Sequence, residues 1–230
     1  MPIEMFDLAG ADDNIRFSPY CWRIRMALAH KGLDVATVPV RFMEKVKLDF
    51  SGQKLVPVIR DGAKVVSDSW AIARYLDEAY ADRAALFPSG SAPLTNFVRH
   101  WTQTRLGMPL MRVALMDIYH TIHEGDRDYF RTSREQRFGK KLEEVIAPEA
   151  EAVTAFRSEL APARELLKDQ PFLNGDAPAF ADYCLFGIFM FARGVSSKQL
   201  LETADPVYAW RERMFDLHGG LARKAPGRGA

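Results

Sequence analysis

The pattern of the chain changes at residues 86–94, and this change limits the fold more than any other feature. Before it, short apolar runs typical of strands alternate with helical segments. After it, no segment has the pattern of a strand, and helical patterns follow one another. Residues 86–94 (LFPSGSAPL) are rich in turn-forming residues and are interpreted as a linker. The sequence therefore predicts a small α/β domain over residues 1–85 and an all-α domain over residues 95–230.

The first domain is expected to contain a mixed four-stranded sheet with helices on its faces. The two strands that flank a helix should be parallel, and the two joined by Asp61-Gly62 should form an antiparallel hairpin. Ser18 and Pro19 favour the start of the first helix, and Gly32 favours its end. The predicted strands cover residues 3–8, 35–40, 56–60 and 64–66, and the predicted helices cover residues 19–31 and 69–80, with irregular helix over 44–54.

The second domain is expected to contain long helices around one apolar helix. Residues 182–192 are apolar on nearly all faces, which is typical of a central helix surrounded by others. Residues 219–230 contain Gly, Pro and Arg and are expected to form a loose tail. The other predicted helices cover residues 95–123, 133–167 with bends at Pro148 and Pro162, and 206–217.

Charge and composition exclude several classes of protein. The 31 Lys and Arg residues nearly balance the 30 Asp and Glu residues, so no basic surface predicts nucleic-acid binding. The longest uncharged apolar run, residues 183–192, is half of the roughly 20 residues that a membrane span needs. Two cysteines build neither a disulfide framework nor a four-cysteine zinc site. The first residues do not resemble a signal peptide. We expect a cytoplasmic protein that does not enter membranes.

Residues 18–23 (SPYCWR) begin a helix directly after a strand and a loop. The first N–H groups of a helix lack partners and carry partial positive charge, so a thiolate is stabilised there. The spacing of Ser18 and Cys21 matches a C-x-x-C redox pattern with its first cysteine replaced. Such a site is suited to activate the thiol of a ligand. Alternatively, Ser18 only caps the helix and Cys21 is a small buried residue.

Two later segments carry features of a peptide-binding site. Pro57 at the start of a strand removes a backbone donor, and a cis bond there would leave the backbone of Val56 available to a peptide. At the next helix start, Ser69 and backbone N–H groups are suited to a carboxylate, and Asp68 is suited to an ammonium group. Alternatively, Pro57 marks an edge strand, and Asp68 and Ser69 are ordinary caps.

Together, the segments SPYCWRIRMAL and LVPVIRDG-KVVSDSWAIARYLDE resemble the glutathione transferase superfamily. Ser-Pro-Tyr-x-Trp-Arg, Asp-Ser-Trp and the DR-x-x-LFP ending are most similar to the etherase-like Ser class of bacteria and fungi. That class includes glutathione-dependent β-aryl etherases. Similar serine motifs occur in the tau and zeta classes.

This resemblance implies a thioredoxin-like N-terminal domain, an all-helical C-terminal domain, and glutathione as co-substrate. Ser18 would stabilise the glutathione thiolate. Val56, before a cis-Pro57, would pair with the cysteinyl backbone, and Asp68 and Ser69 would hold the γ-glutamyl group. The contacts of the glutathione carboxylates around Gln53 and Lys54 stay open.

The implied activity is attack of the thiolate on an apolar or aromatic electrophile, which includes aryl ether cleavage, with roles in detoxification or degradation of aromatic compounds. A homodimer is implied as well. Two alternatives are a non-catalytic protein that binds glutathione or aromatic ligands, and a glutathione-dependent cis-trans isomerase. No metal is expected, because the arrangement of His120, His123 and Glu124 does not match a metal-binding motif.

Three further expectations concern the helical domain. Ala179 stands where relatives usually have a capping Ser or Thr, so the helix start before Asp182 should be weaker by about 1 kcal/mol. Met108, Met111 and Met116 are interpreted first as core residues; alternatively, because their helix should face the thiol site, they adapt to varied apolar ligands. The arginines at positions 131, 134 and 137 are interpreted as a solvated helix face.

Overall fold

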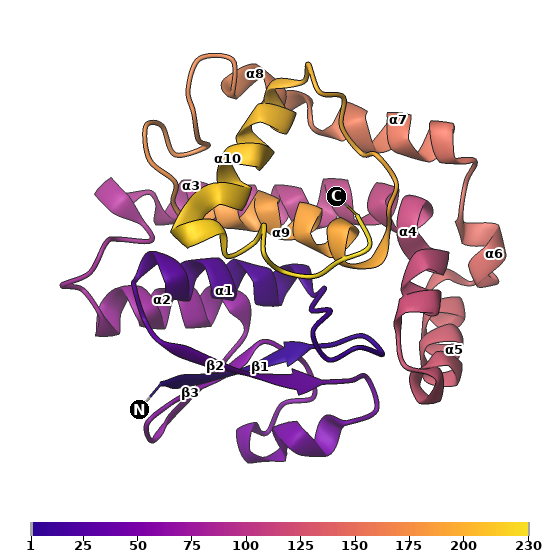
Figure 1. Ribbon diagram of the computed structural model, residues 1–230, viewed down its shortest axis with the longest axis horizontal. Helices are drawn as coiled ribbons and strands as arrows, with labels where there is room; N and C mark the ends of the chain where they lie inside the picture. The colour runs from indigo at the N-terminus through magenta and orange to yellow at the C-terminus, as the bar shows by residue number, and fades with distance from the viewer. Residues whose placement is uncertain (1, 230) are drawn as a thin grey trace.

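A computed structural model describes residues 2–229; Met1 and Ala230, the ends of the predicted domains, lie outside the described residues. The chain forms a four-stranded sheet in the order β2-β1-β3-β4, followed by helices (Figure 1). β1 pairs with β2 in parallel and with β3 in antiparallel orientation, and β3 and β4 form a hairpin, as predicted. The strands are β1 (Ile3–Leu8), β2 (Val35–Val40), β3 (Val58–Asp61) and β4 (Lys64–Ser67).

Local signals explain the ends of these elements. Helix α1 (Pro19–His30) begins at Ser18, whose side chain caps it, and Pro19 suits the first turn because no N–H partner is needed there. The chain leaves the helix through Gly32, which adopts φ +62°. The hairpin turns at Gly62 with φ +56°, a conformation that glycine adopts without strain.

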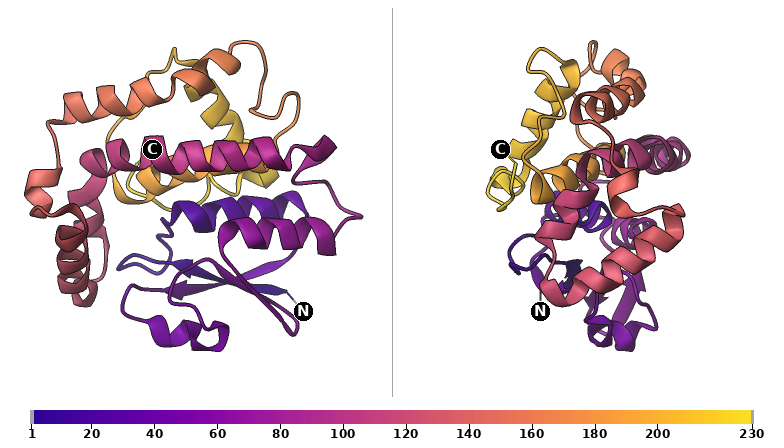
Figure 2. Two further views of the ribbon diagram at one scale, coloured as in Figure 1. Left: turned by 180° about the vertical axis from the view of Figure 1, so that it is seen from behind. Right: turned by 90° about the vertical axis from the view of Figure 1, so that its right-hand side faces the viewer.

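The sheet has two unequal sides. Helices α1 and α2 (Ser69–Ala79) lie between the sheet and the helical half (Figures 1 and 2). Met5 and Ile59 point to this side and belong to the large apolar core. On the other side, Phe6 and Val58 pack with Leu48 of the 3₁₀ helix η1 (Lys45–Ser51). The prediction of helices on the faces of the sheet is confirmed, with the second face covered by this short helix.

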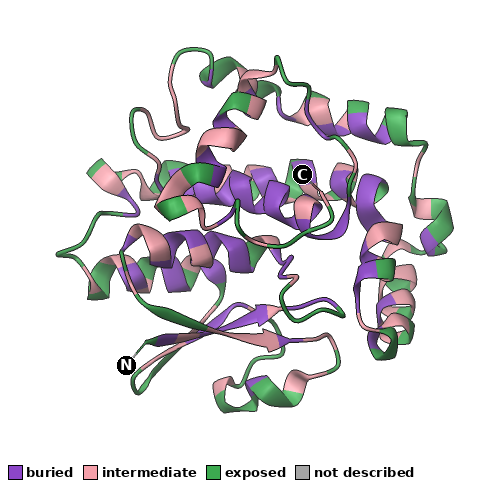
Figure 3. Cartoon of the chain, viewed as in Figure 1, coloured by how far each residue is buried: buried purple, intermediate pink, exposed green. Residues whose placement is uncertain are grey.

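Helix α9 (Phe180–Val195) is the centre of the helical half. All its side chains except Arg193 are buried, as the purple ribbon in Figure 3 shows. Asp182 accepts from the backbone N–H of Ala179 at 3.1 Å, from Leu173 N at 2.7 Å and from Trp210 Nε1 at 2.9 Å. The start of α9 is therefore held by Asp182 although Ala179 offers no side-chain acceptor.

The other helices are α3 (Ala92–Trp101), α4 (Gly107–Thr121), α5 (Arg127–Phe138), α6 (Leu142–Val145), α7 (Glu149–Glu159), α8 (Ala161–Leu166) and α10 (Pro206–Gly220), with short 3₁₀ turns η2 (Pro88–Gly90) and η4 (Glu124–Asp126).

The single helix predicted over residues 95–123 is wrong in two respects. It begins three residues earlier, at Ala92, because Pro93 fits a first helical turn. It is also interrupted by a π-helical segment, η3 (Thr102–Leu106), between α3 and α4. Pro109 has no N–H to donate to the carbonyl of Arg105, so the regular α pattern fails in the turn before it.

Two further predictions for the helical half are corrected. The segment predicted over residues 133–167 is divided into α5, α6, α7 and α8, and its first break, at Gly139 with φ +65°, was not anticipated. The tail is not loose over its described part. The N–H groups of Arg228 and Gly229 both donate to the carbonyl of Arg193, at 2.8 and 2.9 Å. Among residues 2–229, no helix is both long and apolar enough to cross a bilayer.

A hydrogen-bonded group of three side chains joins the two halves. Tyr183 Oη, on α9, lies 2.7 Å from His30 Nδ1 on α1 and 3.1 Å from His218 Nε2 on α10. Burial and, secondarily, the neighbouring His30 lower the pKa of His218 to about 4. Burial also lowers the pKa of His30. The folded state therefore holds both imidazoles neutral at a pH where an unfolded chain begins to protonate them.

This group predicts a loss of stability in acid. An unfolded histidine titrates near pH 6.5, so below that pH the unfolded chain binds more protons than the folded one. The contribution of neutral His218 to the free energy of unfolding should be complete above about pH 6.5 and should be lost as the pH falls through about 4. We expect the free energy of unfolding in urea to change less over this range in His218→Gln than in the parent. His120→Gln, at an exposed position of α4, should keep the parent's slope. If the free energy of unfolding of the parent and of His218→Gln depended on pH in the same way, His218 would not be the cause of the loss of stability.

Candidate functional site

Ser18 lies where the sheet half meets the helical half. Its Oγ accepts a hydrogen bond from the backbone N–H of Cys21 at 3.3 Å. The residue is only 4% exposed, and it lines a cavity between the two halves. Because Oγ uses a lone pair for the cap, its own hydrogen stays available to an anionic atom in the cavity.

Cys21 lies one turn further along α1 and is fully buried in the core, as expected. Burial, followed by the charge of Asp7, raises the pKa of its thiol well above the usual value. The thiol is therefore protonated near neutral pH and does not act as a nucleophile. It also does not compete, as an anion, for the hydroxyl hydrogen of Ser18.

Asp7 is a buried carboxylate beneath α1 that sequence reasoning missed. Its Oδ2 lies 3.7 Å from Arg25 Nη1 and 3.9 Å from Arg16 Nη1. Burial raises the pKa of Asp7, and the two arginines oppose this effect. The strand IEMFDL has two acidic residues, Glu4 and Asp7, and the sequence alone does not show which of them is buried.

The peptide bond between Val56 and Pro57 is cis, and Val56 lines the same cavity as Ser18. Val58, the first residue of β3, pairs with Ser67, the last residue of β4, so Pro57 before β3 and Asp68 after β4 lie at the same end of the hairpin. The structure thus brings Ser18 and Val56 together at one cavity. Lys54 also lines it, whereas Gln53 does not.

Asp68 and Ser69 lie at the start of α2 and do not line this cavity. Asp68 is exposed and adopts φ +73°, and its Oδ1 accepts from Trp70 N at 2.9 Å and from Ala71 N at 3.1 Å. The ordinary capping role is therefore present. The other carboxylate oxygen of Asp68, Oδ2, takes no part in these two hydrogen bonds. Ser69, the next residue, is buried.

The cavity has a volume of about 360 Å³ and mixes apolar and cationic walls. Met108 and Met111 of α4 line it, as the alternative interpretation of these residues predicts, whereas Met116 does not. The interpretation of positions 131, 134 and 137 as one solvated face holds for Arg137, which is exposed, but Arg134 is half-buried, and both Arg134 and Arg137 line the cavity. Its aromatic walls come from both halves of the molecule: Phe17, Tyr20, Phe42, Tyr129, Phe130, Phe138 and Phe191.

No cluster of His, Cys, Asp or Glu suited to a metal ion occurs among residues 2–229. His123 instead accepts a hydrogen bond from Gly125 N through Nδ1, at 3.1 Å, which closes the turn before α5.

Two glycines on one face of α9 allow the start of α1 to approach it closely. A Cβ at Gly187 would lie 2.4 Å from the carbonyl oxygen of Pro19, and a Cβ at Gly194 would lie 2.8 Å from Phe17 Cβ. Both distances are far below van der Waals contact. The position of Ser18, which stands between Phe17 and Pro19, therefore depends on these glycines.

Substitution at Gly187 should test this dependence. A methyl group there must displace backbone atoms of α1, so we expect Gly187→Ala to lower the free energy of unfolding by about 1–3 kcal/mol. Gly107→Ala on α4 is the matched control, because an added Cβ meets no heavy atom within 4 Å there. The control should be neutral or more stable, since alanine favours helices. Equal stabilities of the two variants in urea unfolding would refute the close-approach argument.

Comparisons with known proteins agree with this arrangement. Family models described as glutathione S-transferase N-terminal domain and C-terminal domain match residues 17–79 and 93–214. The chain is 42% identical over 65 residues to glutathione S-transferase Z1 from Arabidopsis thaliana, a match that covers 26% of this chain and 29% of that protein. The chain therefore spans less than a third of that relative's length in this match.

Solved structures match over almost the whole chain. Glutathione transferase GSTFuA3 from Phanerochaete chrysosporium has a TM-score of 0.78 at 26% identity, covering 96% of this chain and 92% of that one. CsGST63524 from Ceriporiopsis subvermispora, solved in complex with glutathione, has a TM-score of 0.85 at 23% identity, covering 95% and 98%. The predicted thioredoxin-like domain followed by a helical domain is confirmed. The chain belongs to the glutathione S-transferase family.

Proposed function

We propose that the protein is a glutathione transferase in which Ser18 stabilises the glutathione thiolate. The observation that carries the proposal is the capped start of α1, where Ser18 Oγ accepts from Cys21 N and faces the cavity that Val56 also lines. A thiolate at this point receives the hydroxyl hydrogen of Ser18 and the partial positive charge of the helix start.

Glutathione would extend from this point along the hairpin. Its cysteinyl backbone pairs with Val56 beside the cis-Pro57, and its γ-glutamyl group reaches Asp68 and Ser69. The free oxygen of Asp68 suits the ammonium group, and the start of α2 suits the carboxylate. Lys54 suits the glycyl carboxylate, because it lines the cavity and lies two residues before Val56 in the sequence.

The reaction that fits this site is nucleophilic attack by sulfur on an apolar or aromatic electrophile. A C–S bond forms, and the leaving group departs with the electron pair of the bond that breaks. In the etherase version, the leaving group is an aryloxide, which takes a proton from water and becomes a phenol. The serine motif supports this version, and a β-aryl ether model compound tests it: a glutathione thioether and a free phenol should form together.

Two other functions give different results in the same assays. A non-catalytic protein would bind glutathione or an aromatic ligand with no turnover. A glutathione-dependent isomerase would convert its substrate without consuming glutathione. Mass spectrometry of substrate and thioether therefore separates the three functions.

The roles of Ser18 and Cys21 can be separated by titration. Ser18→Ala should raise the pKa of the bound glutathione thiol, because the hydrogen bond to the thiolate is lost, and should slow conjugation near neutral pH. Activity should not vanish, since the helix N–H groups still act. Cys21→Ala should change stability more than rate, because the thiol is buried and protonated. The ultraviolet absorbance of the thiolate, measured against pH, gives the pKa of the bound glutathione thiol in each variant. Loss of the thiolate in Cys21→Ala, with none in Ser18→Ala, would reverse the assignment.

We propose a homodimer that pairs through α3. Leu94 and Phe97 lie one turn apart on this helix and are 74% and 70% exposed, which is unusual for large apolar side chains on a free surface. Light scattering should give about twice the chain mass of 26.0 kDa at micromolar concentration. Phe97→Lys should shift the protein toward monomer, whereas Ile146→Lys, at an exposed position after α6, should not. A parent protein that scatters as a monomer would refute the proposal.

A further inference from the structure

The charge of the cavity wall exceeds what glutathione requires. Among the described residues, its lining includes six cationic side chains and no carboxylate: Arg23, Arg41, Lys45, Lys54, Arg134 and Arg137. Glutathione carries two carboxylates, and in the proposed pose the γ-glutamyl one lies outside this cavity, at the start of α2. One glycyl carboxylate does not account for the cations on the far wall.

Arg134 is a half-buried cation of that wall whose Nη1 donates to Ser133 Oγ at 2.9 Å and which has no carboxylate partner. Its guanidinium carbon lies 4.7 Å from the centre of the Phe130 ring and 5.3 Å from that of Phe42. Burial among these rings, and secondarily the positive charge of Arg137, lower its pKa despite the opposing effect of Tyr129. Within the described chain, no carboxylate lies within ion-pair distance of Arg134 or Arg137.

A neighbour on the same helix provides the contrast. Arg131, one turn earlier on α5, pairs with Glu135 at 2.9 Å and with Glu143 at 2.8 Å, and it does not line the cavity. On α5, Arg131 is therefore paired with carboxylates and lies away from the cavity, whereas Arg134 is half-buried, has no carboxylate partner and lines the cavity.

A series of aromatic rings connects Arg134 with the thiolate position. Phe191 lies 6.2 Å from Phe17, Phe17 lies 6.4 Å from Phe42, and Phe42 lies 5.8 Å from Phe130, measured between ring centres. All four rings line the cavity, and Phe17 precedes Ser18. A planar aromatic ligand fits such a wall, because aromatic rings stack or meet edge to face at these separations.

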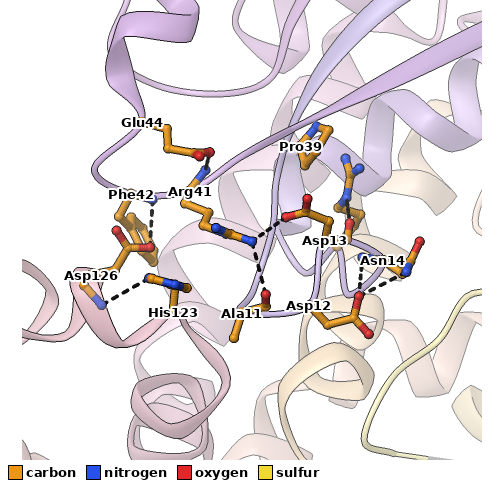
Figure 4. Close-up of polar contacts among 12 residues, drawn as sticks. Ala11, Asp12, Asp13, Asn14, Pro39, Arg41, Phe42, Glu44, His123 and Asp126 are labelled. Atoms are coloured by element: carbon orange, nitrogen blue, oxygen red, sulfur yellow. Dashed lines mark hydrogen bonds and ion pairs between the residues drawn. The ribbon is translucent and has the colours of Figure 1, made fainter.

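Asp126 holds this wall together and is not available to Arg134. Its buried carboxylate accepts from the backbone N–H of Phe42 at 3.2 Å, as Figure 4 shows. It also accepts from the backbone N–H of Met43 at 3.0 Å. Figure 4 also shows Arg41 directed to Asp13, at 2.9 Å, and to the carbonyl of Ala11. Arg41 is thus already paired, whereas Arg134 faces the cavity without a carboxylate.

We propose that the preferred electrophile is a planar aromatic compound with an anionic group, a carboxylate or sulfonate, that Arg134 binds with help from Arg137. The ring lies along the phenylalanine wall, and the reacting carbon faces the thiolate at Ser18. This inference rests on the proposed transferase function for its catalytic part only. Binding of the aromatic acid needs neither glutathione nor turnover.

The test uses two compounds that differ in charge and hardly in shape, 4-chloro-3-nitrobenzoate and 4-chloro-3-nitrobenzamide. Binding to the full chain without glutathione is measured by calorimetry. The benzoate should bind at least about tenfold more tightly, as expected for a charge-assisted pair with arginine. With glutathione, the thiolate adds to the carbon that bears chlorine, a C–S bond forms, and chloride leaves; kcat/KM should show the same preference.

Variants on α5 assign the preference to its residue. Arg134→Gln should remove most of the advantage of the benzoate while amide binding stays within twofold. Arg134→Lys keeps the charge and should keep part of the preference, and circular dichroism verifies that both variants fold. Arg131→Gln is the matched control and should behave as the parent, because Arg131 does not line the cavity.

Three results would overturn the inference: equal binding of the benzoate and the amide to the parent, an unchanged preference in Arg134→Gln, or a loss of glutathione affinity in Arg134→Gln in place of the loss of preference. The last result would mean that the arginines serve a carboxylate of glutathione. Failure of the transferase function gives a different result: the parent would bind no glutathione and would conjugate neither compound. The comparison of benzoate and benzamide binding without glutathione would still test the inference.

Discussion

The close approach of α1 to α9 is the contact on which the rest of the molecule depends. Gly187 and Gly194 let the first turn of α1 and the residue before it lie against the central helix, closer than any other side chain permits. This contact joins the sheet half to the helical half, and it fixes Ser18 at the edge of the cavity that both halves enclose. The group of His30, Tyr183 and His218 joins the other end of α1 to α9 and α10. The same helix therefore serves the stability of the fold and the position of the site.

Much of the sheet half was predictable from short-range signals. The strands, the cap at Ser18 and the hairpin at Asp61-Gly62 each depend on a few neighbouring residues, so the sequence located them, although β3 begins at Val58 and not at residue 56. The cis bond at Pro57 was implied by the family resemblance. The helix boundaries after residue 95 were less predictable. The π segment before Pro109 and the break at Gly139 result from backbone hydrogen bonds that apolar periodicity does not describe.

The site was predictable only in part. Ser18 and Val56 do meet at one cavity, but the sequence did not reveal Arg134 and Arg137 on its far wall. A polar residue on a helix faces water in either case, and periodicity does not distinguish bulk solvent from a cavity. Only the packing of α5 against Phe42, fixed by the bonds from Phe42 and Met43 to Asp126, makes this difference visible. Asp7 was missed for a related reason, because an acidic residue in a strand gives no sign of the two arginines beside it.

The π-helical segment η3 determines which side chains of α4 face the cavity. One residue more than a regular turn rotates everything that follows by about 100° around the helix axis. Met108 and Met111 come immediately after this segment and line the cavity in its present register. Deletion of one residue from η3 would turn a different stripe of α4 toward the cavity without changing the sequence of the sheet half. The length of η3 therefore controls which side chains line the helical wall of the cavity, independently of the sheet half.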